Sequence, residues 1–195
     1  EPLLTRLSTR LNLSALPMRP NRPNPGPPPR QRNWRIYVDD LLRHLEARND
    51  GPVIGMGHSM GAACTVMAAH RRPDLFDSLI LIETVMVTRW IYRLMRLMPR
   101  AVMLRTQPSK GTLHKQNRWK TRDEFFAAWS RHRTYQQFDV EGLQALREHG
   151  VRDTPDGDVE LVFDKNWEAH SYMLPPYLIE LLADLTVPVV SIQTK

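Results

Sequence analysis

The sequence predicts an α/β protein in which a mostly parallel, partial sheet is interrupted by a long, mainly helical insertion. Two short apolar runs, residues 52–56 and 78–82, are bounded by turn residues and separated by an alanine-rich segment. This order is typical of a parallel β-α-β unit. Residues 85–183 then have a mostly helical pattern, and a third apolar run follows at residues 187–192. The chain therefore leaves its sheet and returns to it.

The part before residue 52 predicts a strand, a loop and a helix. Residues 11–16 are a short apolar stretch, which we expect to be a buried strand. Residues 19–33 are dense in proline and glycine, which indicates a loop with stiff, extended pieces. Apolar residues recur at helical spacing over residues 34–48, and Asn49-Asp50-Gly51 ends this helix.

Residues 52–83 contain the clearest local pattern. The run at residues 52–56 predicts a buried strand, residues 62–71 are free of proline and glycine and predict a helix, and residues 78–82 predict a second strand. Between the first strand and the helix stands GHSMG, residues 57–61.

The insertion predicts several further elements. They are a basic amphipathic helix at 87–103, a polar loop at 104–120, a helix at 121–133 with capping-box spacing, a short helix at 140–149, a hairpin turn at Asp156-Gly157, and helix over 167–185 broken at Pro175-Pro176.

Composition limits the classes of function. The chain has 195 residues, a formal charge of +6 and a single cysteine, so it contains no intrachain disulfide. It has no apolar run of the roughly 20 residues that a membrane span needs, and no secretory signal pattern at its start. We therefore expect a cytoplasmic protein. The sequence begins with Glu1 rather than Met, which suggests that this is not the natural N-terminus.

Ser59 is the candidate nucleophile. A nucleophilic serine needs an exposed hydroxyl, a base and donors for the oxyanion. A strand, a sharp turn and a helix present the hydroxyl in a strained conformation, and small residues two positions to either side, here Gly57 and Gly61, let strand and helix approach closely. The backbone N–H of Met60 is then one oxyanion donor, assisted by the helix dipole.

The segment around this serine resembles the α/β-hydrolase fold, in its cap-bearing, esterase-like branch. The matching words are VIGMGHSMGAACTVMAAHRRPDLFDSLILIE, residues 53–83, with ALPMRPNRPNPGPPPRQRNWRIYVDDLLRHL, residues 15–45, before it and DLTVPVVSIQTK, residues 184–195, after it. The resemblance implies a core over residues 1–84 with a nucleophile elbow, a helical cap over 85–183, and a return to the core over 184–195. It also implies that residues 3–11 are a helix and its exit.

The resemblance implies a catalytic order of nucleophile, acid and histidine. The acid commonly follows the strand that ends at Ile192, and the histidine follows one further strand. By this comparison the chain is expected to be an internal fragment, inactive by itself, whose histidine and usual acid lie beyond residue 195 and whose second oxyanion donor lies before residue 1.

Other residues of the chain are weaker candidates for the missing groups. Glu83 stands at the carboxyl end of a strand, the edge where open α/β sheets build their sites, and some relatives carry their acid there. A structural glutamate is the alternative interpretation. His58 lies within the elbow but is expected to point away from the nucleophile. The remaining histidines are expected to be surface or satisfied polar residues, with His170 the least implausible base: His44, His70, His114, His132, His149 and His170.

Two functions from different classes remain open. One is a serine-dependent hydrolase of an ester, thioester or related acyl bond, acting on a small-molecule substrate without cofactor or metal. The other is a non-catalytic binding module in which helix 87–103, with Arg89, Arg93, Arg96 and Arg100 in one stripe, contacts an anionic membrane or nucleic acid. We expect the first, with this helix packing its apolar face over the pocket as part of the cap. No nucleic-acid partner and no stable membrane insertion are expected, and the oligomeric state is left open.

Overall fold

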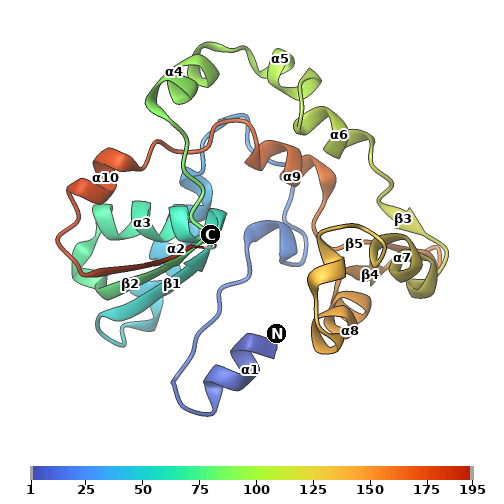
Figure 1. Ribbon diagram of the computed structural model, residues 1–195, viewed down its shortest axis with the longest axis horizontal. Helices are drawn as coiled ribbons and strands as arrows, with labels where there is room; N and C mark the ends of the chain where they lie inside the picture. The colour runs from blue at the N-terminus through green and yellow to red at the C-terminus, as the bar shows by residue number, and fades with distance from the viewer. Residues whose placement is uncertain (1, 194–195) are drawn as a thin grey trace. The chain divides into compact units, whose positions relative to one another are not determined.

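The computed structural model describes residues 2–193 (Figure 1). Residue 1 and residues 194–195, at the outer ends of the expected segments 1–84 and 184–195, lie outside the described residues. The elements in chain order are α1 Pro2–Ser8, η1 Arg19–Asn21, α2 Arg35–Arg48, β1 Val53–His58, α3 Met60–Arg71, η2 Pro73–Leu75, β2 Phe76–Ile82, α4 Arg89–Leu97, α5 Arg100–Arg105, α6 Ser109–His114, β3 Arg118–Trp119, α7 Arg122–Trp129, η3 Tyr135–Gln137, α8 Val140–His149, β4 Val151–Asp153, β5 Val159–Leu161, α9 Lys165–Ser171, α10 Ile179–Ala183 and β6 Val189–Ile192.

The chain divides into two units. Residues 28–110 and 169–195 form the parallel-sheet unit, and residues 1–27 and 111–168 form the second, mixed unit. The boundaries between these units differ from those expected from the sequence. Residues 85–110 and 169–183, which were expected in the cap, belong to the same unit as the sheet. That residues 85–183 are an inserted cap stays a prediction.

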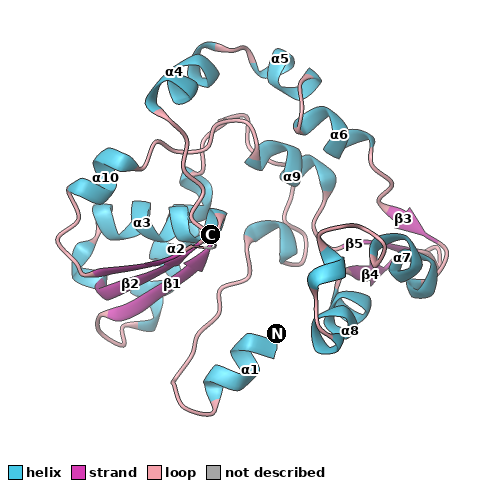
Figure 2. Ribbon diagram, viewed as in Figure 1, coloured by secondary structure: helices cyan, strands magenta, loops and turns pink. Residues whose placement is uncertain are grey.

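The sheet of the first unit is fully parallel, in the order β1-β2-β6 (Figure 2). Strands β1 and β2 are connected through α3, as the β-α-β pattern predicted. Strand β6, which follows the long insertion, pairs with β2. In register, His58 pairs with Ile82, and Ile82 pairs with Ile192. The carboxyl ends of the three strands therefore meet at one edge.

Helix α3 forms the core of this unit with one face of the sheet. Its Ala62, Ala63 and Val66 are fully buried, as is Leu79 of β2. The small alanines let the helix lie close to the strands. On the other face, Ile54, Met56 and Val190 have exposed fractions of 60%, 45% and 58%, although parallel sheets usually bury both faces.

The mixed unit contains a small antiparallel sheet in the order β3-β5-β4 (Figure 2). The predicted hairpin at Asp156-Gly157 connects β4 to β5, and Gly157 takes the positive φ of +84° that such a turn favours. Five buried apolar residues form the core: Trp119, Phe125, Val151, Val159 and Leu161. The segment expected to be helical therefore also carries this sheet.

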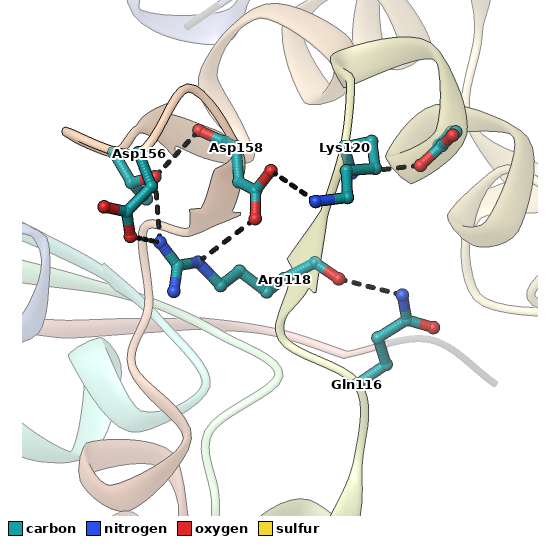
Figure 3. Close-up of polar contacts among 7 residues, drawn as sticks. Gln116, Arg118, Lys120, Asp156 and Asp158 are labelled. Carbon is teal, nitrogen blue, oxygen red and sulfur yellow. Dashed lines mark hydrogen bonds and ion pairs between the residues drawn. The ribbon is translucent and has the colours of Figure 1, made fainter.

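Ion pairs connect β3 and the residue after it with the turn between β4 and β5 (Figure 3). Arg118 pairs with Asp156 at 2.7 Å and with Asp158 at 3.8 Å, and Lys120 pairs with Asp158 at 3.2 Å. Gln116 donates to the Arg118 carbonyl at 2.8 Å. Exposed pairs of this kind each contribute about 0–1 kcal/mol, so the apolar core contributes most of the stability.

Several predicted elements are confirmed. Helices α1, α2, α3 and α8 and strands β1, β2 and β6 lie within a few residues of their expected bounds. Helix α7 begins as its capping box predicted, because the Thr121 hydroxyl accepts from Glu124 N–H at 3.1 Å. The Glu124 carboxylate accepts in return from the N–H of Lys120, one residue earlier than in the usual box.

Three of the predicted elements were wrong. Residues 11–16 form no strand, and they are exposed or half-buried coil. The single helix expected at 87–103 is two helices, α4 and α5, because Pro99 lies between them and a proline cannot donate to a continuing helix. The loop expected at 104–120 contains helix α6 and strand β3.

Candidate active site

Ser59 is the single residue between β1 and α3. Its backbone has φ 52° and ψ −115°, a conformation that non-glycine residues rarely adopt. A serine that merely capped the helix would have an extended backbone, and its hydroxyl would accept from an N–H of the first turn. The Ser59 side chain makes no such capping bond. The strained backbone of Ser59 therefore carries a hydroxyl that does not cap the helix.

The two glycines of GHSMG have different roles. A Cβ added to Gly57 would lie 2.5 Å from both Ala62 N and Gly61 C, so this position tolerates only glycine where strand and helix meet. A Cβ added to Gly61 meets nothing within 4 Å. The expectation that both glycines are needed for the close approach was therefore correct for Gly57 and wrong for Gly61.

A third glycine of this segment has a packing role that the sequence analysis missed. A Cβ at Gly55 would lie 2.8 Å from Thr65 Cγ2 and 2.9 Å from the Phe76 ring. Gly55 and Gly57 alternate along β1 and both face α3. The signal available in the sequence was this alternation, since residues two apart on a strand share a face.

The start of α3 offers backbone donors next to the serine. Ala63 N–H donates to Ser59 C=O at 3.2 Å, the first bond of the helical pattern. The N–H groups of Met60, Gly61 and Ala62 precede this bond and so have no acceptor within the helix. With the positive end of the helix dipole, they form an environment that favours negative charge. Met60 is the residue directly after Ser59, as the oxyanion hypothesis requires.

Glu83 lies beside Ser59 at the carboxyl edge of the sheet. The pairing of His58 with Ile82 makes Ser59 and Glu83 the next residues of two adjacent parallel strands. Ser59 N–H donates to Ile82 C=O at 2.9 Å, and Glu83 N–H donates to Ile192 C=O at 2.9 Å. Glu83 is half-buried and has a φ of 47°. The expected acidic candidate is thus a neighbour of the candidate nucleophile in the sheet register.

His170 is a buried residue that contacts a backbone carbonyl. Its ring is fully buried, and Nε2 lies 2.7 Å from the carbonyl oxygen of Gln31. Because a carbonyl only accepts, Nε2 carries the proton. Burial lowers the pKa of His170 below its ordinary value of 6.5 and so favours the neutral ring. His58 is exposed. Nothing in these contacts places either histidine against the Ser59 hydroxyl.

Ser59 is not among the residues that line either of two open cavities. One, of about 570 Å³ in the mixed unit, is lined by charged residues that pair with one another, including Arg122 with Asp153 at 3.0 Å and Arg147 with Asp123. The other, of about 460 Å³, is lined by residues of α2, α3 and α10, such as Asp39, Met67 and Leu181. Among residues 2–193, no group of three or more potential ligands is placed to hold a metal ion.

The chain belongs to the alpha/beta hydrolase family, because residues 3–191 match the model of that family. The fold described above, with its parallel sheet and flanking helices, is the one expected from the resemblance. This confirms the predicted family and fold class.

Individual relatives match over different shares of their length. Monoglyceride lipase of Rattus norvegicus is 36% identical over 59 residues, which are 28% of this chain and 20% of the enzyme. The structure of E-2-(acetamidomethylene)succinate hydrolase matches 98% of this chain and 66% of its own, with a TM-score of 0.67 and 21% identity. The peroxisomal α/β-hydrolase Lpx1 of Saccharomyces cerevisiae matches 83% of this chain and 45% of its own, with a TM-score of 0.64 and 19% identity. The chain thus spans about one fifth of the lipase, and the two structures support the fold alone.

Proposed function

We propose that the protein is a serine hydrolase that cleaves an ester, thioester or related acyl bond of a small molecule through an acyl-enzyme. Membership of the alpha/beta hydrolase family supports hydrolysis in general. The observation that carries the finer proposal is the backbone of Ser59, held at positive φ between β1 and α3 with no capping bond. Strain of this kind clusters at catalytic positions.

The proposed reaction has two steps. Ser59 Oγ attacks the carbonyl carbon of the substrate as its proton passes to a base, and the oxygen of the tetrahedral intermediate accepts from Met60 N–H. The intermediate collapses, and the alcohol or thiol leaves with the proton. Water then attacks the acyl-serine by the same route and releases the carboxylic acid. The family resemblance implies a histidine as the base, and Glu83 is the candidate acid for orienting it.

The test is covalent labelling of the protein at its natural length with a fluorophosphonate probe. We expect modification at Ser59, located by peptide mass spectrometry, and its loss in Ser59→Ala. Ser130→Ala, at the end of α7 in the mixed unit, is the matched control and should label like the wild type. Labelling that persists in Ser59→Ala, or that is absent from a folded wild-type protein, would refute the nucleophile.

Hydrolysis of p-nitrophenyl esters provides the functional readout. Loss of the nucleophile is expected to lower kcat by a factor of about 10⁴–10⁶. The variant Glu83→Gln should lower kcat without abolishing labelling by a reactive probe if its carboxylate orients the base. Unchanged kcat in Glu83→Gln would leave Glu83 as a structural residue at the end of β2.

A further inference from the structure

The outer face of helix α4 exposes large apolar side chains. Trp90, Leu94 and Leu97 follow one another at spacings of four and three and have exposed fractions of 66%, 52% and 82%. The residues that α4 turns toward the rest of its unit are others: Tyr92 and Met95 are half-buried, and Tyr92 lies against Tyr177 with ring centroids 6.3 Å apart. The expectation that the apolar face of this helix packs inward over a pocket was therefore wrong for these three residues.

Cationic side chains line one flank of this stripe. Arg93 and Arg96 are exposed and, on a helix of 3.6 residues per turn, lie together beside the three apolar residues. Arg89 lies on the same flank and pairs with Glu180 at 3.2 Å. The surrounding segment, residues 84–110, contains six arginines and lysines and no aspartate or glutamate.

Contacts from another part of the unit hold α4 in shape. The Arg32 guanidinium donates to the carbonyls of Met95 at 3.1 Å and Arg96 at 2.9 Å, and also to that of Met98. These are carbonyls that a helix end leaves without an intrahelical donor. A helix of nine residues is too short to be stable alone. The bonds from Arg32 stabilise α4 without contacts from its outer face.

We propose that the outer face of α4, namely Trp90, Leu94 and Leu97 with Arg93 and Arg96, docks on the surface of an anionic lipid bilayer. An interfacial helix buries apolar side chains at the level of the headgroups while its cations contact anionic lipids, and tryptophan favours this level. A nucleic acid would use the arginines but leave the apolar stripe in water. No described helix is long and apolar enough to cross a membrane, and the proposed contact is peripheral.

The experiment is sedimentation of the full chain with vesicles of phosphatidylcholine alone or with 30% phosphatidylglycerol. We expect binding to the anionic vesicles that weakens as salt is raised. Each arginine near such a surface contributes about 1 kcal/mol, or about fivefold, so Arg93→Gln/Arg96→Gln should weaken partitioning roughly 25-fold. The variant Leu94→Gln/Leu97→Gln should weaken it at least about tenfold.

Matched variants and one local probe make the test specific. Arg131→Gln/Arg133→Gln removes the same charge from exposed positions of the mixed unit, and Val140→Gln removes an apolar side chain that is 81% exposed on α8. Both should bind like the wild type. Brominated lipids should quench the fluorescence of the wild type much more than that of Trp90→Phe, since three of the other four tryptophans are at least 94% buried.

Equal weakening by the control variants, or binding that is the same with neutral and anionic vesicles, would overturn the proposal. So would binding to duplex DNA without binding to vesicles. Circular dichroism should first show that each variant is folded. Ser59→Ala should retain vesicle binding, so failure of the proposed catalytic function and failure of the proposed surface are separate results.

Discussion

The two glycines that flank the serine provide a sharp test of the elbow geometry. In Gly57→Ala, the new methyl group would lie 2.5 Å from two backbone atoms of α3 and 2.7 Å from Ala62 Cα. Carbon atoms in contact are ordinarily 3.5–4.0 Å apart, so β1 and α3 would have to separate by about 1 Å. A helix backbone cannot rotate away as a side chain can. The cost should therefore lie at the upper end for overpacking, about 3 kcal/mol.

In Gly61→Ala, the methyl group meets no atom within 4 Å, and Gly61 does not have positive φ. Replacing glycine by alanine within a helix stabilises by about 0.5–1 kcal/mol. The two variants of one motif should therefore differ by roughly 3.5–4 kcal/mol in the free energy of unfolding. Gly57→Ala alone should lower Tm by about 6–12 °C.

Thermal and urea unfolding followed by circular dichroism measure this difference, and fluorophosphonate labelling reports on the serine. We expect Gly57→Ala to lose both stability and labelling, while Gly61→Ala keeps its fold. If Gly57→Ala unfolds with the wild-type midpoint, or if Gly61→Ala is destabilised as strongly, the close approach of β1 and α3 does not depend on Gly57 and the reasoning fails.

Two further predictions concern buried titratable groups. Burial raises the pKa of Cys64 from its ordinary 9.0 to about 12, so the fraction of thiolate at pH 8 falls about a thousandfold. A disulfide reagent should therefore modify Cys64 at least a thousandfold more slowly in the native protein than in urea. Comparable rates in the two states would contradict the burial. Burial also lowers the pKa of His170, so below about pH 6.5 the unfolded chain binds the proton more readily than the folded one. Stability should be fully present above pH 6.5 and decline as the pH falls toward the folded pKa. The variant His170→Gln keeps a donor for the Gln31 carbonyl, and its urea midpoint should change less between pH 7.5 and 5 than that of the wild type. An identical pH dependence of the midpoint in both proteins would exclude His170 as the cause.

The elements around Ser59 could be predicted because their signals are local. A short apolar run, a glycine-flanked serine and an alanine-rich segment each fix one element, and their order fixes a parallel unit. The different roles of Gly57 and Gly61 could not be read from the motif, which treats them alike. Only the path of α3 decides that one faces the backbone of the helix and the other faces open space.

The errors of prediction arose where an element depends on a distant partner. Strand β3 is two residues long and exists through its pairing with β5, some forty residues later in the chain. Residues 11–16 have a strand-like composition but no strand of the described residues pairs with them. Pro99 did mark the end of α4, and this signal was available. For α4, periodicity identified an apolar stripe but could not determine what that stripe faces.

Backbone strain distinguishes Ser59 and Glu83 independently of the motif. Among the described residues, four that are not glycine have positive φ. Two are Asn24 and Asn49, a residue type that tolerates this conformation. The other two are Ser59 and Glu83, which follow paired residues at the carboxyl edge of the sheet.

Strain of this kind costs about 1–3 kcal/mol per residue and persists only where its surroundings enforce it. Here the enforcing contacts are the bonds from Ser59 N–H to Ile82 C=O and from Glu83 N–H to Ile192 C=O, which extend the sheet by one residue at each strand. Ser59 and Glu83 are both half-buried. The two strained residues thus reduce stability at the carboxyl edge of the sheet, where α/β proteins bind their ligands. This supports a chemical role for that edge, whichever substrate binds there.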